Sequence, residues 1–165
     1  MQKRVFQILC DNTAGVLSRI SGLFTRRGYN IDSITAGVTA QPEISRITIV
    51  TSGDEEILTQ IEKQVSKLVD VRDIKELKPE ESVYRELALV KVKVASDRRH
   101  EVIAVADVFR AKIVDVSPDS LTIEITGDQA KVDAFLALLT DFEILELART
   151  GIAGLVRGTE GVVYI

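Results

Sequence analysis

The sequence predicts an α+β protein of two consecutive units that share one order of elements, β-α-β-β-α-β. Some segments carry apolar residues every three to four positions, which is the spacing of an amphipathic helix, and short runs of β-branched residues between them favour strands. Turn-forming residues separate these segments. The chain has 165 residues, 45% of them apolar and 28% charged, which is enough for two small domains that each bury a core.

The first unit opens with a strand and a helix. Residues 4–10 are mostly apolar and end at a turn-forming run at residues 11–13. The helix that follows places Val16 and Ile20 at helical spacing. It is expected to stop at Gly28, because glycine commonly ends a helix in the left-handed conformation.

A hairpin, a second helix and a strand complete this unit. Residues 30–39 and 44–52 are rich in β-branched residues and predict two strands joined by a polar loop. Asp54 opens the second helix, which a strand over residues 71–77 follows. This helix is expected to bury four residues about one turn apart: Ile57, Ile61, Val65 and Leu68. The order is that of a split βαβ, or ferredoxin-like, sandwich.

The second half is expected to repeat this order after a linker at residues 78–83. The predicted elements are a strand at 84–94, a helix at 97–109, strands at 112–116 and 121–126, a helix at 128–139 and a strand at 143–148. The sequence therefore predicts two tandem ferredoxin-like βαββαβ sandwiches, with domains at residues 1–77 and 84–165. The second domain is expected to include a tail that contains four glycines.

Charge and cysteine content exclude several classes of function. The net charge is −4, and neither half has the clustered basic surface that phosphate neutralisation requires, so nucleic-acid binding is not expected. Cys10 is the only cysteine, which excludes an intramolecular disulfide and multi-cysteine metal sites and suits a reducing compartment. The first residues form only a short apolar run, so we expect a cytoplasmic protein without a membrane span.

The sequence offers no catalytic and no metal-binding residues. His100, the only histidine, lies in the charged first turn of a predicted helix, where we expect it to be solvated. Cys10 ends an apolar strand and has no second histidine to activate it, which favours a buried, inert thiol. Motifs for dinucleotide, triphosphate, zinc and acyl-transfer sites are absent, so no catalysis is expected from this chain alone.

The segment at residues 11–17 allows two interpretations. In the first, Asn12 or Thr13 caps the helix by accepting a hydrogen bond from a first-turn N–H group, which is worth about 1 kcal/mol. In the second, the segment binds a ligand, because Gly15 costs about 1 kcal/mol relative to alanine and leaves the backbone bare for close approach. A helix N-terminus attracts a carboxylate, and the side-chain carbonyl of Asn12 accepts from an ammonium group. The pattern alone leaves both interpretations open.

A family resemblance covers nearly the whole chain. Residues 11–37 read DNTAGVLSRISGLFTRRGYNIDSITAG and resemble the start of an ACT domain, in detail that of the regulatory small subunit of acetohydroxyacid synthase, also called acetolactate synthase. The similarity continues through residues 45–71, 86–92 and 133–139. It ends at residues 148–158 with ARTGIAGLVRG, which is highly specific together with GLFTRRGYNI.

The resemblance implies a subunit that catalyses nothing alone. Such a subunit binds the large catalytic subunit, raises its activity and confers feedback inhibition by a branched-chain amino acid, usually valine. The complex condenses two pyruvates to acetolactate in the synthesis of valine, leucine and isoleucine. Thiamine diphosphate, magnesium and FAD belong to the large subunit, so no cofactor is expected on this chain.

The resemblance also implies where the effector binds. ACT domains of this family pair side by side as a homodimer, with the effector between the strand-to-helix loop of one chain and an Asn-Ile segment of the other. The matching effector-binding residues are Asn12, Ala14, Gly15, Val16 and Leu17 in the loop, and Asn30 and Ile31 in the Asn-Ile segment. Ile31 or Val16 is expected to form an apolar wall, and Gly37 stands where relatives are expected to have alanine or a similarly small residue. One methylene is worth only about 1–3 kcal/mol, so the sequence does not rank valine, leucine and isoleucine.

Three alternative functions compete with this one. A free-standing enzyme would need a site formed only in three dimensions, which the single histidine and missing motifs argue against. An RNA-binding module on the same scaffold needs exposed aromatic residues, whereas only 5% of the chain is aromatic. A stand-alone amino-acid sensor acting on another partner is opposed only by the resemblance of the tail.

Overall fold

The computed structural model describes residues 1–162 and confirms the predicted α+β, ferredoxin-like fold. The chain forms two compact units, one of residues 1–84 with 151–162 and one of residues 85–150. The first unit contains β1 (Gln2–Asp11), α1 (Val16–Arg27), β2 (Asn30–Val38), β3 (Ile44–Gly53), α2 (Glu55–Val65), β4 (Val71–Glu76), the 3-10 helix η1 (Pro79–Glu81) and β9 (Ala153–Val156). β5 (Ser82–Lys93) continues into the second unit, which also contains α3 (Arg99–Val108), β6 (Lys112–Ser117), β7 (Ser120–Gly127), α4 (Gln129–Ala137) and β8 (Glu143–Arg149).

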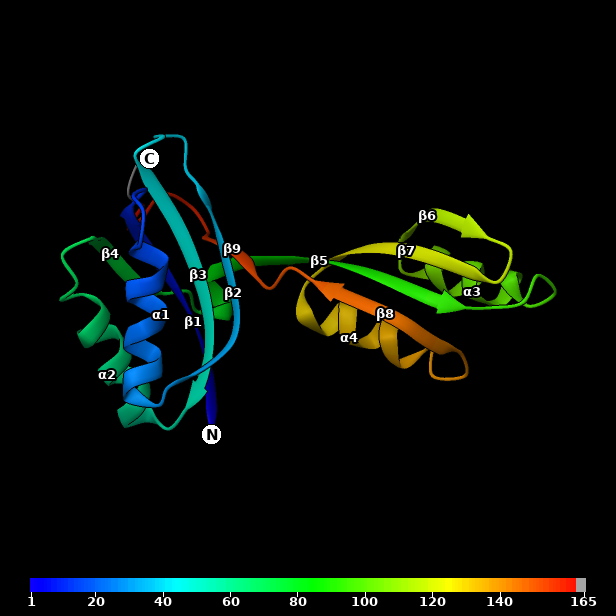
Figure 1. Cartoon of the computed structure of the whole chain (residues 1–165), viewed down its shortest axis with the longest axis horizontal. Coiled ribbons are helices and arrows are strands. Elements are labelled where there is room, and N and C mark those ends of the chain that lie inside the picture. Colours follow the sequence, from blue (N-terminus) through cyan, green and yellow to red (C-terminus); the bar gives the residue numbers. More distant parts are fainter. Residues whose placement is uncertain (163–165) are drawn as a thin grey trace. The chain divides into compact units, whose positions relative to one another are not determined.

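The four-stranded antiparallel sheet of the first unit has the order β2-β3-β1-β4. Figure 1 shows α1 and α2 on one face of this sheet. Phe6 and Ile8 of β1 pack in the core with Ile20 of α1 and Leu58 of α2. All six residues at positions 5–10 are buried, although only alternate side chains of a strand point to one face. Both faces of β1 are therefore covered.

Two helix ends of the first unit follow the local sequence. α1 stops at Gly28, which has a φ of 69° as the predicted left-handed end requires. α2 is capped by Asp54, whose Oδ1 accepts a hydrogen bond from the N–H of Ile57 at 2.9 Å. The boundaries of both helices therefore depend on residues within one turn of each end.

The inner face of α2 agrees with the predicted one at two of four positions, Ile61 and Val65. Leu58, Ile61 and Val65 are buried, whereas Ile57 is half-buried and Leu68 lies beyond the end of the helix. Ile61 and Val65 belong to both the predicted and the observed face, and the two faces differ mainly in whether Ile57 or its neighbour Leu58 is fully buried. The sequence has apolar residues at both positions, so only packing on the sheet selects the buried one.

The second face of the sheet is covered by the C-terminal segment. Ile152 is 2% exposed and packs with Val5, Val50 and Leu77 in a separate apolar cluster. Burying one isoleucine side chain contributes about 1.5–3 kcal/mol, which anchors the segment on the sheet.

The limits of the units consequently differ from those expected. The tail assigned to the second domain lies with the first unit, and so do the linker residues 78–83. Within this unit the N–H of Arg157 donates to the carbonyl of Glu81 at 2.8 Å. The physical reason is that an apolar sheet face opposite two helices needs a cover, which residues close in sequence do not supply.

The sheet of the second unit repeats the topology of the first, with the order β6-β7-β5-β8. In Figure 1, α3 and α4 lie on one face of it. Its core is formed mainly by β5, β7 and these helices, with Val90, Ile123, Val102 and Phe135 fully buried. The repeat in the sequence is thus a repeat in the fold.

Candidate effector site

The loop between β1 and α1 is exposed and is attached to the turn between β2 and β3. The N–H of Asn12 donates to the carbonyl of Glu43 at 2.8 Å, and its side-chain Nδ2 donates to the carbonyl of Pro42 at 2.8 Å. Residues 12–15 are all exposed to solvent. The structure therefore presents this loop at the surface in an ordered conformation.

Gly15 is the N-cap residue of α1 and adopts a left-handed conformation with a φ of 85°. Within residues 1–162 no side chain caps the helix, so the interpretation in which Asn12 or Thr13 caps it is wrong. The backbone conformation alone favours glycine at this position, because a residue with a Cβ is strained at such a φ whether or not a ligand binds. The first-turn N–H groups have no partner within the helix and no side-chain cap. They are available to an anion.

Two ion pairs lie beside the loop. The Nε of Arg19 is 2.6 Å from Asp70, and the Nε of Arg72 is 2.7 Å from Asp11. A Cβ built on Gly15 would lie 2.9 Å from Nη1 of Arg19, so this guanidinium sits directly over the loop. Arg19 was not among the residues predicted for the site, although its spacing one turn after Gly15 places it on the same side of the helix. Asp70 and Arg72 were not predictable locally, because they are brought to the loop by the fold.

The side chains of the matched loop residues point in different directions. Val16 is 3% exposed and packs in the core, so of the two residues predicted to form an apolar wall, Ile31 or Val16, this one offers little surface within a single chain. Leu17 is 47% exposed and presents an apolar surface instead. Ala14 is exposed. A Cβ built on Gly37 would have no neighbour within 4 Å, so no pocket of this chain depends on a glycine there.

Asn30 and Ile31 lie at the opposite end of the sheet from the loop. β3 pairs Asn30 with Ser52 and pairs Asp11 with Ile44. The two positions on β3 are eight residues apart, which corresponds to about 26 Å along an antiparallel strand. One chain therefore does not bring the two predicted halves of the site together.

β2, which begins with these two residues, is an edge strand of its sheet in the described part of the chain. Ile34 and Val38 on it are 36% and 59% exposed. The start of the strand is ordered, because the carbonyl of Asn30 accepts a hydrogen bond from Oγ1 of Thr51 at 2.5 Å. An exposed edge strand with apolar residues is a template for pairing with another chain.

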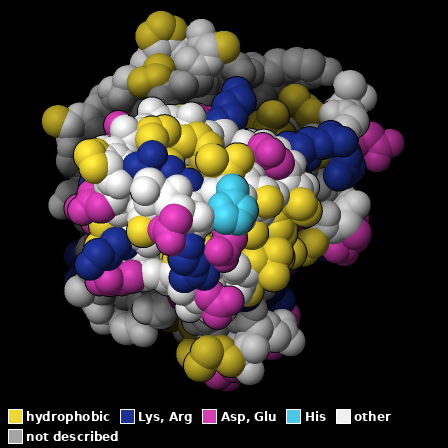
Figure 2. Space-filling model, turned by 90° about the vertical axis from the view of Figure 1, so that its right-hand side faces the viewer, with side chains coloured by type: hydrophobic (Ala, Val, Ile, Leu, Met, Phe, Trp, Pro, Cys, Tyr) yellow, Lys and Arg dark blue, Asp and Glu magenta, His cyan; other side chains and the backbone are white. Residues whose placement is uncertain are grey.

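The cysteine, the histidine and the acidic side chains do not form a further reactive site in residues 1–162. Cys10 is 1% exposed, and burial, followed by the charges of Asp11 and Asp70, raises the pKa of its thiol. Figure 2 shows the histidine at the surface, and His100 is exposed. Within residues 1–162, no group of three or more His, Cys, Asp or Glu side chains comes together to hold a metal ion. In the same residues no helix is both long and apolar enough to span a membrane.

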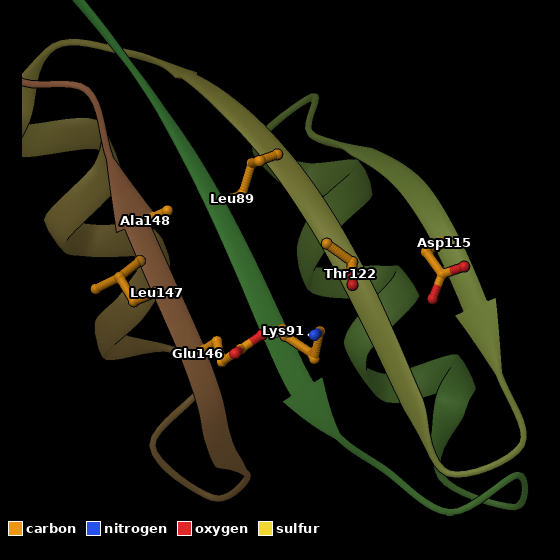
Figure 3. Close-up of a pocket in the computed structure, with 7 residues that line it drawn as sticks. All are labelled: Leu89, Lys91, Asp115, Thr122, Glu146, Leu147 and Ala148. Carbon is orange, nitrogen blue, oxygen red and sulfur yellow. Dashed lines mark hydrogen bonds and ion pairs between the residues drawn. The ribbon is translucent and has the colours of Figure 1, made fainter.

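A shallow pocket of about 750 Å³ lies on the sheet of the second unit, on the face turned away from α3 and α4 (Figure 3). It is lined by Leu89, Lys91, Asp115, Thr122, Glu146, Leu147 and Ala148. Nζ of Lys91 is 2.5 Å from Glu146, an exposed ion pair that water screens. None of the residues matched to the effector site lines this pocket.

An exposed glycine loop between the first strand and helix of a βαββαβ sandwich defines an ACT-domain protein, here with a second sandwich after it. A model described as "AHAS small subunit-like ACT domain" matches residues 6–73, and one described as "Small subunit of acetolactate synthase" matches residues 85–158. The chain belongs to the acetolactate synthase small-subunit family, which confirms the resemblance seen in its sequence.

Relatives match along almost the full chain. A probable acetolactate synthase small subunit of Methanothermobacter thermautotrophicus is 50% identical over 156 residues, which is 94% of this chain and 93% of that protein. The small subunit of acetolactate synthase isozyme 3 of Escherichia coli is 46% identical over 94% of this chain and 96% of its own. The crystal structure of the acetolactate synthase small subunit from Thermotoga maritima has a TM-score of 0.87 at 41% identity, covering 96% of this chain and 99% of that one.

Proposed function

We propose that this chain is the regulatory subunit of a cytoplasmic acetolactate synthase and that it catalyses nothing alone. It binds the large catalytic subunit, raises its activity and makes it sensitive to feedback inhibition by a branched-chain amino acid, with valine as the first candidate. Thiamine diphosphate, magnesium and FAD would then be bound by the large subunit. Family membership supports the partner, and the uncapped N-terminus of α1 at Gly15 is the observation that carries the effector site.

Pairing of two chains through β2 would complete this site. Two β2 edges related by a two-fold axis run antiparallel, so Asn30 at the start of one strand lies beside Val38 at the end of the other. β3 pairs Val38 with Ser45, at the end of the sheet where β1 leads into the loop. Asn30 of one copy is thereby brought to the loop end of the second copy, which removes the separation found within one chain.

The groups at the loop suit an amino acid. Its carboxylate would accept hydrogen bonds from the first-turn N–H groups and from the Nη groups of Arg19, which lie beside Gly15. The Nδ2 of Asn12 is engaged with Pro42, which leaves its Oδ1 to accept from the ammonium group. Exposed Leu17 and the Ile31 of the second copy provide apolar surface for the branched side chain.

Inhibition follows if the effector binds one arrangement of the holoenzyme better than another. A difference of about 1–3 kcal/mol between the inhibited and active arrangements is sufficient for a 5- to 150-fold effect. The effector shifts the population by this difference and needs no contact with the reacting groups.

The test uses the chain reconstituted with its large subunit and two substitutions at one position. Gly15→Asp introduces a carboxylate where that of the effector is expected, whereas Gly15→Asn has nearly the same shape, tolerates the left-handed conformation and carries no charge. We expect Gly15→Asp to abolish valine binding measured by calorimetry while activation of the large subunit is retained. Gly15→Asn should keep measurable binding.

Two outcomes would contradict the proposal. Unchanged valine affinity in Gly15→Asp would place the effector elsewhere. A wild-type chain that leaves acetolactate formation by the large subunit unchanged, with and without branched-chain amino acids, would remove the regulatory function itself.

A further inference from the structure

Residues 151–162, here called the C-terminal strap, cross the face of the first sheet opposite α1 and α2. The strap is held at several points in the first unit. Ile152 is buried among Val5, Val50 and Leu77. Towards the other end, the carbonyl of Gly161 accepts a hydrogen bond from Nζ of Lys75 at 2.7 Å. The strap is therefore attached to the first unit near both of its ends.

The start of the strap rests on β2. Gly151 has a φ of 83°, and a Cβ built on it would lie 2.9 Å from Oγ1 of Thr35 and 3.1 Å from Cβ of Ser33. Both contacts are with short side chains that have little room to give way. Ser33 and Thr35 follow closely after Ile31 on the strand proposed to meet the effector and a second chain. A displacement of this strand therefore meets the strap at Gly151.

The residue before the strap is held by the second unit. The N–H of Thr150 donates to the carbonyl of Leu87 at 3.0 Å, and its Oγ1 accepts from the N–H of Leu87 at 3.1 Å. One peptide bond thus joins a residue bonded to β5 of the second unit to a residue seated on β2 of the first. Thr150 and Gly151 are thus the two residues at which the chain passes from the second unit back to the first.

We propose that the C-terminal strap transmits effector occupancy from β2 to the second unit, and that the Gly151 contact with Ser33 and Thr35 is the coupling point. This inference rests on the proposed function. Gly151 meets two requirements that a larger residue would not: it adopts a left-handed conformation, and it lies close to β2. Loss of the contact should separate effector binding from the response to it.

The experiment compares two glycines of the strap in the reconstituted holoenzyme. Gly151→Ala places a methyl group against β2, whereas Gly158→Ala, at a φ of 70°, imposes the same backbone strain with no neighbour within 4 Å. We measure valine affinity by calorimetry and the ratio of uninhibited to inhibited rate at saturating valine. For Gly151→Ala we expect affinity within about threefold of wild type and an inhibition ratio that falls toward 1 from its initial value of about 5 to 150. Gly158→Ala should retain the wild-type ratio.

A second variant changes the other side of this contact, the residue on β2. Ser33→Thr adds a methyl group at the same point, and its β-branched side chain suits a strand, so it keeps the test available if Gly151→Ala does not fold. The same loss of inhibition with retained binding is expected.

Three results would overturn the inference: an unchanged inhibition ratio in these variants, an equal fall in Gly158→Ala, or binding and inhibition that are lost together. These three results can be distinguished from a failure of the proposed function. In that case the wild-type holoenzyme itself would show no valine inhibition, before any substitution is made.

Discussion

Ile152→Ala tests whether the C-terminal strap is part of the core of the first unit. The wild-type side chain is 2% exposed, and its neighbours Val5, Val50 and Leu77 are 6%, 0% and 1% exposed. Truncation of a buried isoleucine to alanine costs about 2–5 kcal/mol, composed of lost transfer free energy and the cavity left behind. The strap can move in part to fill the cavity, so we expect about 3 kcal/mol. This is a large share of the roughly 5–15 kcal/mol that stabilises a typical domain.

Leu155→Ala is the matched control on the same strap. Its side chain is 57% exposed, so truncation should change the free energy of unfolding by no more than about 0.5 kcal/mol. The chain contains no tryptophan, and urea unfolding is therefore followed by circular dichroism. Only the transition of the first unit should shift, because Ile152 packs within that unit.

Hydrogen exchange adds a local measurement. In wild type the amide of Arg157 donates to the carbonyl of Glu81, and its protection should fall in Ile152→Ala if the strap detaches more readily. The reasoning would be refuted by equal small losses in Ile152→Ala and Leu155→Ala. That result would mean that the sheet face is stable without its cover.

Two further predictions concern single side chains. Burial, followed by nearby carboxylates, raises the pKa of Tyr84 to about 12 from 10.0, and its hydroxyl donates to the carbonyl of Leu77. Its contribution to stability should be complete below pH 10 and be lost as the pH rises towards 12, so Tyr84→Phe should flatten the stability curve measured across this interval. Arg149 pairs with Glu86, which is 4% exposed, and Arg149→Met should cost about 3 kcal/mol in urea unfolding because a buried charge loses its partner. Asp133→Asn, which removes the exposed partner of Arg149, should cost less than about 1 kcal/mol, and equal losses would contradict this account.

Much of the fold was predictable because the signals are local. Gly28 ends α1 and Asp54 caps α2 through bonds that span one turn of helix. On α2 the burial of Ile61 and Val65 was predicted, but Leu58 is fully buried in place of Ile57, since both residues are apolar and the pattern fits either. The choice between them is made by the sheet that the helix covers.

The residues of the candidate site remain a prediction from the sequence, and their geometry depends on the fold. Gly15 is part of the effector site predicted from the sequence, and its left-handed conformation at the N-cap depends on how the chain enters α1. Val16 was assigned to the site, whereas the rotation of the same helix turns it into the core. Arg19 was overlooked because a basic residue on a helix surface is common, and only its position over Gly15 distinguishes it.

The sequence by itself determined the order of the main elements and their repetition, because periodicity and turn residues act over a few positions. It also indicated the family, through the resemblance of its motifs at residues 11–37 and 148–158. Only the tertiary structure decided that Ile152 covers Val5 and that Asn30 and the loop lie at opposite ends of one sheet. These outcomes depend on contacts between segments that are far apart along the chain. Such contacts form because they bury the apolar surface that the local elements leave exposed to water. The size and position of that surface cannot be read from a short stretch of sequence.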